Sequence, residues 1–182
     1  MVQPPNPIVE VERAPSPSFA TDSRARAPVP PKSEPEEPAP RASEDVTLEL
    51  CAAVTARIDA FPSQRAALLE EERLDDDAWQ CASGRWAEAM AAALQRADSS
   101  PMERFDDGYV AALEVLRGPI DAETFAALEV AIERGRLDEV IVGLGIVRPA
   151  VIRIKRCWTR RLLRDAQLRE SVRRAIAERR KW

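Results

Sequence analysis

Apolar residues recur at steps of three and four along the chain from Val46 onward. Leu48, Cys51 and Ile58 belong to one such stripe, which stops just before Pro62. Steps of three and four place side chains on one face of an α-helix, whereas a half-buried strand requires strict alternation. The helix formers Ala, Leu, Glu and Arg also dominate this region. The sequence therefore predicts an all-α fold, a helical bundle.

Proline divides the chain into two kinds of sequence. Of its 15 prolines, 11 lie within the first 40 residues, where they alternate with Ser, Ala and charged residues. Such a segment has too few large apolar side chains to offset the entropy lost on ordering. We expect residues 1–45 to form a disordered, proline-rich leader, followed by helical units at residues 46–118 and 119–182.

Capping and turn residues punctuate the helical region. Asp75, Ser100 and Asp121 suit the N-caps of helices. Gly118 and Gly135 suit helix ends, because glycine adopts the left-handed backbone that closes a helix. These marks predict about four helices in each unit.

The second unit repeats the apolar pattern of the first. When Leu74 is placed over Ile146, the helices that follow match in spacing, and each carries a Trp twelve residues further on, Trp86 and Trp158. A long period of this kind is typical of a repeated helical unit. We predict two copies of one unit, with each indole N–H bonded to a backbone partner. The residues predicted to form the structural core are Trp79, Trp86, Met90, Phe125, Ile132, Trp158 and Leu162.

Residues 47–90 read TLELCAAVTARIDAFPSQRAALLEEERLDDDAWQCASGRWAEAM. The order of leading helix, Pro-x-x-x-x-x-x-Leu, loop, acidic cap and Trp-x-x-x-hydrophobic helix resembles a bacterial helical module. This module is associated with high-GC proteobacteria and with genes near type VI secretion clusters. Residues 120–176 look like the same module with a more basic last helix. The chain departs from it at Glu72-Arg73, where a glycine is expected, as at Gly145. The resemblance implies an accessory or adaptor role.

Residue types suited to catalysis or metal binding are scarce. The chain contains no His, which removes the commonest general base and the commonest neutral metal ligand. The acidic runs at 70–72 and 75–77 fit helix ends better than a cation site. Gly143-Leu144-Gly145 lacks the third glycine of a dinucleotide-binding loop and predicts a helix end. We expect no catalytic residue, metal site, cofactor or small-molecule substrate, and a protein that is not an enzyme.

Cysteine usage and hydropathy bear on location. Cys51, Cys81 and Cys157 are odd in number, widely spaced and next to apolar stripes, so we expect reduced thiols in a reducing compartment. The sequence contains no apolar run long enough to span a membrane, and we expect no signal peptide. These features predict a cytoplasmic protein without membrane contact.

Charge is segregated along the chain. Residues 1–45 carry a net charge of −3 and residues 46–147 a net charge of −11, whereas residues 148–182 carry 13 basic and 3 acidic side chains. The overall charge of −4 therefore conceals a strongly dipolar sequence.

A ridge of arginines lies on the helix that bears Trp158. Its members fall opposite the apolar stripe at steps of three and four: Arg153, Arg156, Arg160 and Arg164. We expect this ridge to face away from the core and, with the terminal Trp182, to be the candidate partner-binding site. Three interpretations stay open: pairing with the acidic first unit within the chain or across a dimer, recruitment of an acidic protein, and contact with nucleic-acid phosphates. The net-acidic body argues against the third, because it repels phosphate.

The expected function is that of a helical interaction, adaptor or scaffold protein, accessory to a bacterial secretion system. It would contact an acidic protein, or a second copy of itself, through the basic C-terminal helix. The first alternative is a nucleic-acid-associated helical protein that uses the arginine ridge. The second is a small enzyme of unrecognised type.

Overall fold

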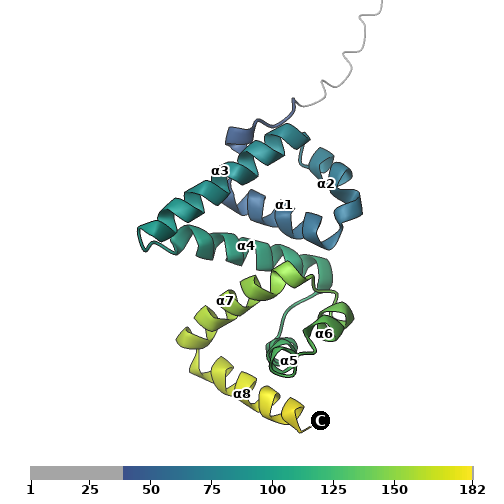
Figure 1. The fold of residues 1–182 in the computed structure, drawn as a ribbon, viewed down its shortest axis with the longest axis vertical. Coiled ribbons are helices and arrows are strands. Elements are labelled where there is room, and N and C mark those ends of the chain that lie inside the picture. The colour runs from purple at the N-terminus through teal and green to yellow at the C-terminus, as the bar shows by residue number, and fades with distance from the viewer. Residues whose placement is uncertain (1–38, 182) are drawn as a thin grey trace, which may run out of the picture. The chain divides into compact units, whose positions relative to one another are not determined.

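The computed structural model describes residues 39–181, and within that range the chain forms helices and no strand (Figure 1). The predicted all-α fold is confirmed. Two short 3-10 turns, Ser43–Asp45 and Pro62–Gln64, accompany the α-helices. The eight α-helices of this region are α1 (Leu48–Ala60), α2 (Arg65–Glu71), α3 (Asp76–Gln95), α4 (Ser100–Arg117), α5 (Ala122–Glu133), α6 (Leu137–Gly143), α7 (Arg148–Arg164) and α8 (Ala166–Arg180).

The end of the predicted leader belongs to the folded part of the chain. The N–H of Arg41 donates to the carbonyl of Arg73 at 2.7 Å, and the side chain of Val46 is fully buried. Residues 43–45 form the first 3-10 turn. The ordered region therefore begins before residue 46, because the backbone here bonds to the loop between α2 and α3. Residues 1–38 of the leader lie outside the described residues.

The helix ends follow the capping residues closely. The side chains of Asp75 and Asp121 each accept a hydrogen bond from the N–H three residues later, at 2.7 and 2.8 Å, which confirms both as N-caps. The cap of α4 is Ser99 rather than Ser100. Ser100 is the first residue of the helix. Its N–H has no partner within the helix and instead donates to the carboxylate of Asp98 at 3.0 Å.

The helices form two groups that share one core. In the first half of the folded region, α1 packs along α4 (Figure 1); in the second half, α5 packs against α8. Helices α4 and α7 pack against each other and join the halves. Buried residues of both halves form one continuous hydrophobic cluster. The two groups are therefore parts of one folded body.

Most residues predicted for the core lie in it. Trp79, Phe125 and Trp158 are buried, and Trp86, Met90 and Leu162 are half-buried and pack against the core. Ile132 is an error of the prediction, since it is 36% exposed. Ile132 shares a face with the buried Phe125 and Leu128, but it lies in the last turn of α5, next to the final residue Glu133.

The two halves share their helix order and their pairing. Each consists of a long, a short and two long helices, and in each the first helix packs along the fourth. The loops before α3 and α7 also agree in detail. Arg73 and Gly145 both adopt a left-handed backbone, with φ of 58° and 61°, and Leu74 and Ile146 each donate an N–H to the carbonyl five residues earlier at 2.8 Å. That the halves are copies of one unit remains a prediction.

Candidate functional site

The arginines predicted to form an outward ridge mostly face α4. Asp106 of α4 is completely buried, and Arg156 binds it through two hydrogen bonds, Nε to Oδ2 at 2.7 Å and Nη2 to Oδ1 at 2.9 Å. Arg153 approaches the same carboxylate, with Nη1 3.4 Å from Oδ1. A buried carboxylate requires such partners, because an unpaired charge in the interior is costly. These contacts form the centre of what we call the α4–α7 seam.

Aromatic rings hold Arg153 in place. Its guanidinium lies 4.7 Å from the ring centroids of both Phe105 and Tyr109. The Tyr109 hydroxyl donates to Asp59 of α1 at 2.8 Å. Burial, followed by this hydrogen bond, raises the pKa of Tyr109 above its ordinary value. The seam is therefore continuous with the core of the first half.

The next arginine along α7 is also occupied. Nη2 of Arg160 lies 2.6 Å from Oδ1 of Asp107 and 3.3 Å from the Glu103 carbonyl. The neighbouring Cys157 thiol donates to the same Asp107 oxygen at 3.2 Å. Burial, and then the contact with Asp107, raises the pKa of Cys157 to about 12. The thiol is protonated at neutral pH, so it lacks the thiolate that a nucleophilic cysteine needs.

The expectation of an outward ridge is therefore wrong for Arg153, Arg156 and Arg160. Sequence reasoning placed them opposite the apolar stripe of α7, but α4 covers that side with Asp106 and Asp107. Of the three interpretations, pairing with the acidic half within the chain is the arrangement observed here. The signal that was missed is the pair of aspartates, which interrupts the apolar face of α4 between Phe105 and Tyr109. Arg164 is exposed and forms no ion pair with any described residue, and Trp182 lies outside the described residues.

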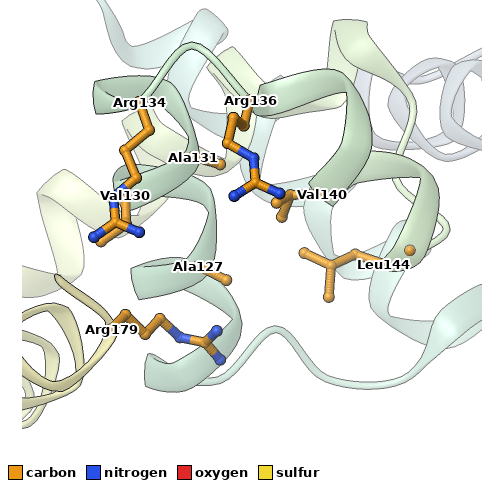
Figure 2. A pocket seen from close by; sticks show the side chains of 9 residues that line it. Ala127, Val130, Ala131, Arg134, Arg136, Val140, Leu144 and Arg179 are labelled. Atoms are coloured by element: carbon orange, nitrogen blue, oxygen red, sulfur yellow. The ribbon is translucent and has the colours of Figure 1, made fainter. Parts of the chain in front are cut away.

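A different surface of the second half is open, the α5–α6 groove. It is a cavity of about 440 Å³ with a mainly apolar floor. Figure 2 shows the apolar side chains between the two helices, with three guanidinium groups around them. The groove is lined by Ala127, Val130, Ala131, Arg134, Arg136, Val140, Gly143, Leu144 and Arg179.

The turn between α5 and α6 places two of these arginines at one end of the groove. Gly135 adopts φ of 67°, and the chain reverses there so that α6 begins two residues later. Arg134 and Arg136 flank this glycine and project beside the groove, and Arg179 of α8 lies away from the turn (Figure 2). We call these three residues the arginine rim.

The arginine rim has only weak internal partners. Arg136 pairs with Glu139 at 2.7 Å, with both side chains more than 60% exposed, and Arg179 lies 3.6 Å from Glu123. Arg134 donates to the carbonyl of Arg180 at 2.8 Å. Exposed ion pairs are worth about 0–1 kcal/mol. None of the residues that line the groove is acidic. The rim can therefore exchange these contacts for a ligand's carboxylates at little cost.

Sequence reasoning did not find this groove. It treated Gly135 as a helix end and did not consider the arginines on either side of it. The signal was the string Arg134-Gly135-Arg136, since a turn glycine flanked by two cations places both at the mouth of a helix pair. The corresponding segment of the first half, residues 61–64 between α1 and α2, contains no basic residue. Arg179 lies on α8, so only tertiary packing brings it to the groove.

Two further features of residues 39–181 complete the description. In this range no group of three or more His, Cys, Asp or Glu residues is arranged to hold a metal ion. None of the described helices has both the length and the apolar composition needed to cross a bilayer. Cys51, Cys81 and Cys157 are free thiols, and Cys81 is the exposed one.

Comparison with known proteins yields no match. No family model matches the chain, and no curated protein or solved structure is significantly similar to it. Inferences about its function therefore rest on the geometry of the groove and the seam.

Proposed function

We propose that this chain is a non-enzymatic helical adaptor, which binds an acidic segment of a partner protein through its second half. The observation that carries the proposal is the arginine rim. Three guanidinium groups surround an open apolar groove in which no lining residue is acidic. Apolar surface supplies affinity in a protein interface, and peripheral charge selects partners of opposite sign.

The arginines of the α4–α7 seam are not available to a partner in the same way. Arg153 and Arg156 share the buried carboxylate of Asp106, and a competing ligand would leave that charge unpaired. Removing one member of a buried pair costs about 3–5 kcal/mol, more than a single interfacial contact returns. This occupancy also weakens the nucleic-acid alternative, since three of the four arginines invoked for phosphate contacts already have partners.

The cellular setting of this role extends the same proposal. A cytoplasmic location is consistent with three free thiols, two of them buried. A connection to a bacterial secretion system is supported by the resemblance of residues 47–90 to a helical module.

A matched pair of charge reversals tests the proposal. Arg134 and Arg96 both cap the C-terminus of a helix, α5 and α3, with nearly identical backbone angles. The full-length chain and its Arg134→Glu and Arg96→Glu variants are used for affinity capture from nuclease-treated extract of the source cells. We expect an acidic protein in stoichiometric amount with the wild type and with Arg96→Glu, and about tenfold less with Arg134→Glu.

Two results would contradict the proposal. Equal capture by all three proteins would show that the second half does not select the partner. Retention of the purified chain on DNA at roughly 0.1 M salt, where phosphate contacts still hold, would favour the nucleic-acid alternative instead.

A further inference from the structure

Gly143 is in a position where nothing in the fold requires a glycine. It is the last residue of α6, and a Cβ atom built on it meets nothing within 4 Å apart from its chain neighbours and the backbone of its own helix. Its neighbour Gly145 differs, because the left-handed backbone there, with φ of 61°, disfavours any side chain. Gly143 therefore neither relieves a clash nor provides the left-handed turn that Gly145 provides.

The open space at Gly143 belongs to the α5–α6 groove. Across the groove, α5 presents Ala127 and Ala131, two small residues one helical turn apart on the same face. Larger apolar side chains, those of Val130, Val140 and Leu144, line the rest of the floor. Small residues on both walls leave the space between the helices unfilled.

The walls of the groove also restrict the conformation of what can bind. Both are α-helices, whose backbone groups are bonded within each helix, so an extended peptide would find no strand edge to pair with. A helical ligand satisfies its own backbone and needs only side-chain contacts. Helix-in-groove recognition uses apolar anchors at positions i, i+3 or i+4, and i+7.

We propose that the α5–α6 groove is the docking site for an acidic amphipathic helix of a partner protein. The absent side chain at Gly143 makes room for the apolar anchors of that helix, and the arginine rim binds carboxylates beside them. The choice of occupant rests on charge complementarity, because the rim is cationic and the lining holds no acid. This inference rests on the proposed function and adds the site and the conformation of the bound segment.

The test fills the groove without changing its charge. A fluorescein-labelled synthetic peptide of about 18 residues, five helical turns, carries Leu at i, i+4, i+7 and i+11 with Glu between them. Its binding to the full-length chain is followed by fluorescence anisotropy. Gly143→Leu is compared with Gly84→Leu on α3, where an added Cβ also meets nothing within 4 Å. A scrambled peptide of the same composition, with its Leu residues on all faces, is the second control.

We expect the amphipathic peptide to bind wild type and Gly84→Leu with equal affinity, with a dissociation constant on the order of 10–100 µM. Gly143→Leu should weaken binding by at least about tenfold. The scrambled peptide should bind no better to wild type than to Gly143→Leu. Circular dichroism of both variants checks that the helices persist, and a Leu in place of glycine favours α6.

Several outcomes would overturn the inference. One is that Gly143→Leu binds the peptide as the wild type does, and another is that neither protein binds it. A concentration-dependent dimer that Gly143→Leu abolishes would make a second copy of the chain the occupant. If Arg134→Glu loses the captured partner while Gly143→Leu retains it, the proposed function stands and the groove is not the docking site.

Discussion

The two halves of the folded region have the same helix order and pairing but differ in how each encloses its tryptophan. The indole N–H of Trp86 donates to the carbonyl of Val46 at 2.9 Å, as the sequence predicts. Trp158 stacks on Phe125, with centroids 4.7 Å apart and planes within 8°, and its N–H finds no partner among the described residues. The prediction of a backbone partner is therefore wrong for Trp158. Equivalent positions in a helical pattern can serve hydrogen bonding in one half and ring stacking in the other.

A second difference between the halves lies in their charge. The acidic face of α4 and the basic face of α7 are the surfaces on which the halves meet, with Asp106 and Asp107 against three arginines. Part of the opposite charge of the two halves is therefore paired inside the molecule. The arginine rim, which belongs to the second half alone, stays available to a partner.

The largest expected effect comes from truncating the tryptophans. Trp158→Ala removes a ring that is only 2% exposed and stacked on Phe125, so we expect a loss of about 4 kcal/mol in the free energy of unfolding. Trp86→Ala removes a half-buried ring and one hydrogen bond, and we expect about 2 kcal/mol. Urea denaturation followed by circular dichroism measures both. Equal losses would mean that the two environments do not differ in energy.

Next in size is the seam between the halves. Asp106→Asn keeps the shape of the side chain but removes its charge, which leaves Arg153 and Arg156 without their carboxylate. We expect a loss of about 3 kcal/mol in the free energy of unfolding, because the site is fully buried on the aspartate side. Glu49→Gln, which breaks the exposed pair with Arg104, is the control and should change stability by less than about 0.5 kcal/mol. Similar losses of stability in the two variants would show that the seam contributes little to holding the halves together.

Substitutions in the loops before α3 and α7 should change stability by smaller amounts and in opposite directions. Arg73→Gly should stabilise the chain by about 0.5–1 kcal/mol, since a non-glycine residue at φ of 58° is strained. Gly145→Ala should destabilise it by about 1 kcal/mol for the same reason. Thermal and urea unfolding of both variants measure these changes. A destabilising Arg73→Gly would mean that the arginine side chain has a role the second half lacks.

The smallest expected effect concerns the cap of α5. The hydrogen bond from the Thr124 backbone lowers the pKa of Asp121. A lowered folded-state pKa contributes stability that is present above the unfolded pKa, about 3.9, and is lost as pH falls through the folded pKa. Asp121→Asn keeps the cap and loses only its charge at the helix N-terminus, so we expect a cost of about 0.3 kcal/mol at pH 7.

Unfolding of the wild type and Asp121→Asn is compared from pH 7 down to about pH 3. The difference between them should shrink as pH falls below the unfolded pKa and approach zero below the folded pKa, where the wild-type carboxyl is neutral in the folded state as well. A difference that grows as pH falls would assign the charge a destabilising role. Asp75→Asn at the N-terminus of α3 is the matched variant for the first half, with a cap of the same geometry.

Much of this fold is predictable from local sequence, as α3 illustrates. The carboxylate of Asp75 caps it, and Trp79 and Ala82 fall on its buried face as their spacing predicts. Such features depend on residues within one or two turns of each other, so the sequence displays them directly. The error at Ile132 arose in the last turn of a helix, where a position on the buried face does not by itself ensure burial.

The candidate site was less accessible from sequence. Arg153 and Arg156 were expected at the surface because the side of α7 opposite the Trp158 stripe contains no large apolar run. A carboxylate on another helix, about 50 residues earlier in the chain, makes that side an interior one. The groove also takes a lining residue from α8, Arg179, and no periodicity within one helix encodes that approach.

The sequence by itself determined the helices, their caps and the segregation of charge, since each of these follows from neighbours along the chain. Tertiary structure alone decided which arginines are available to a partner. Whether a guanidinium is paired depends on which helix packs against it, and that packing joins residues far apart in sequence. Arg153, Arg156 and Arg160, which the sequence predicts to be exposed, are paired in the seam. Arg134 and Arg136, which the sequence places only in a turn, are available beside the groove.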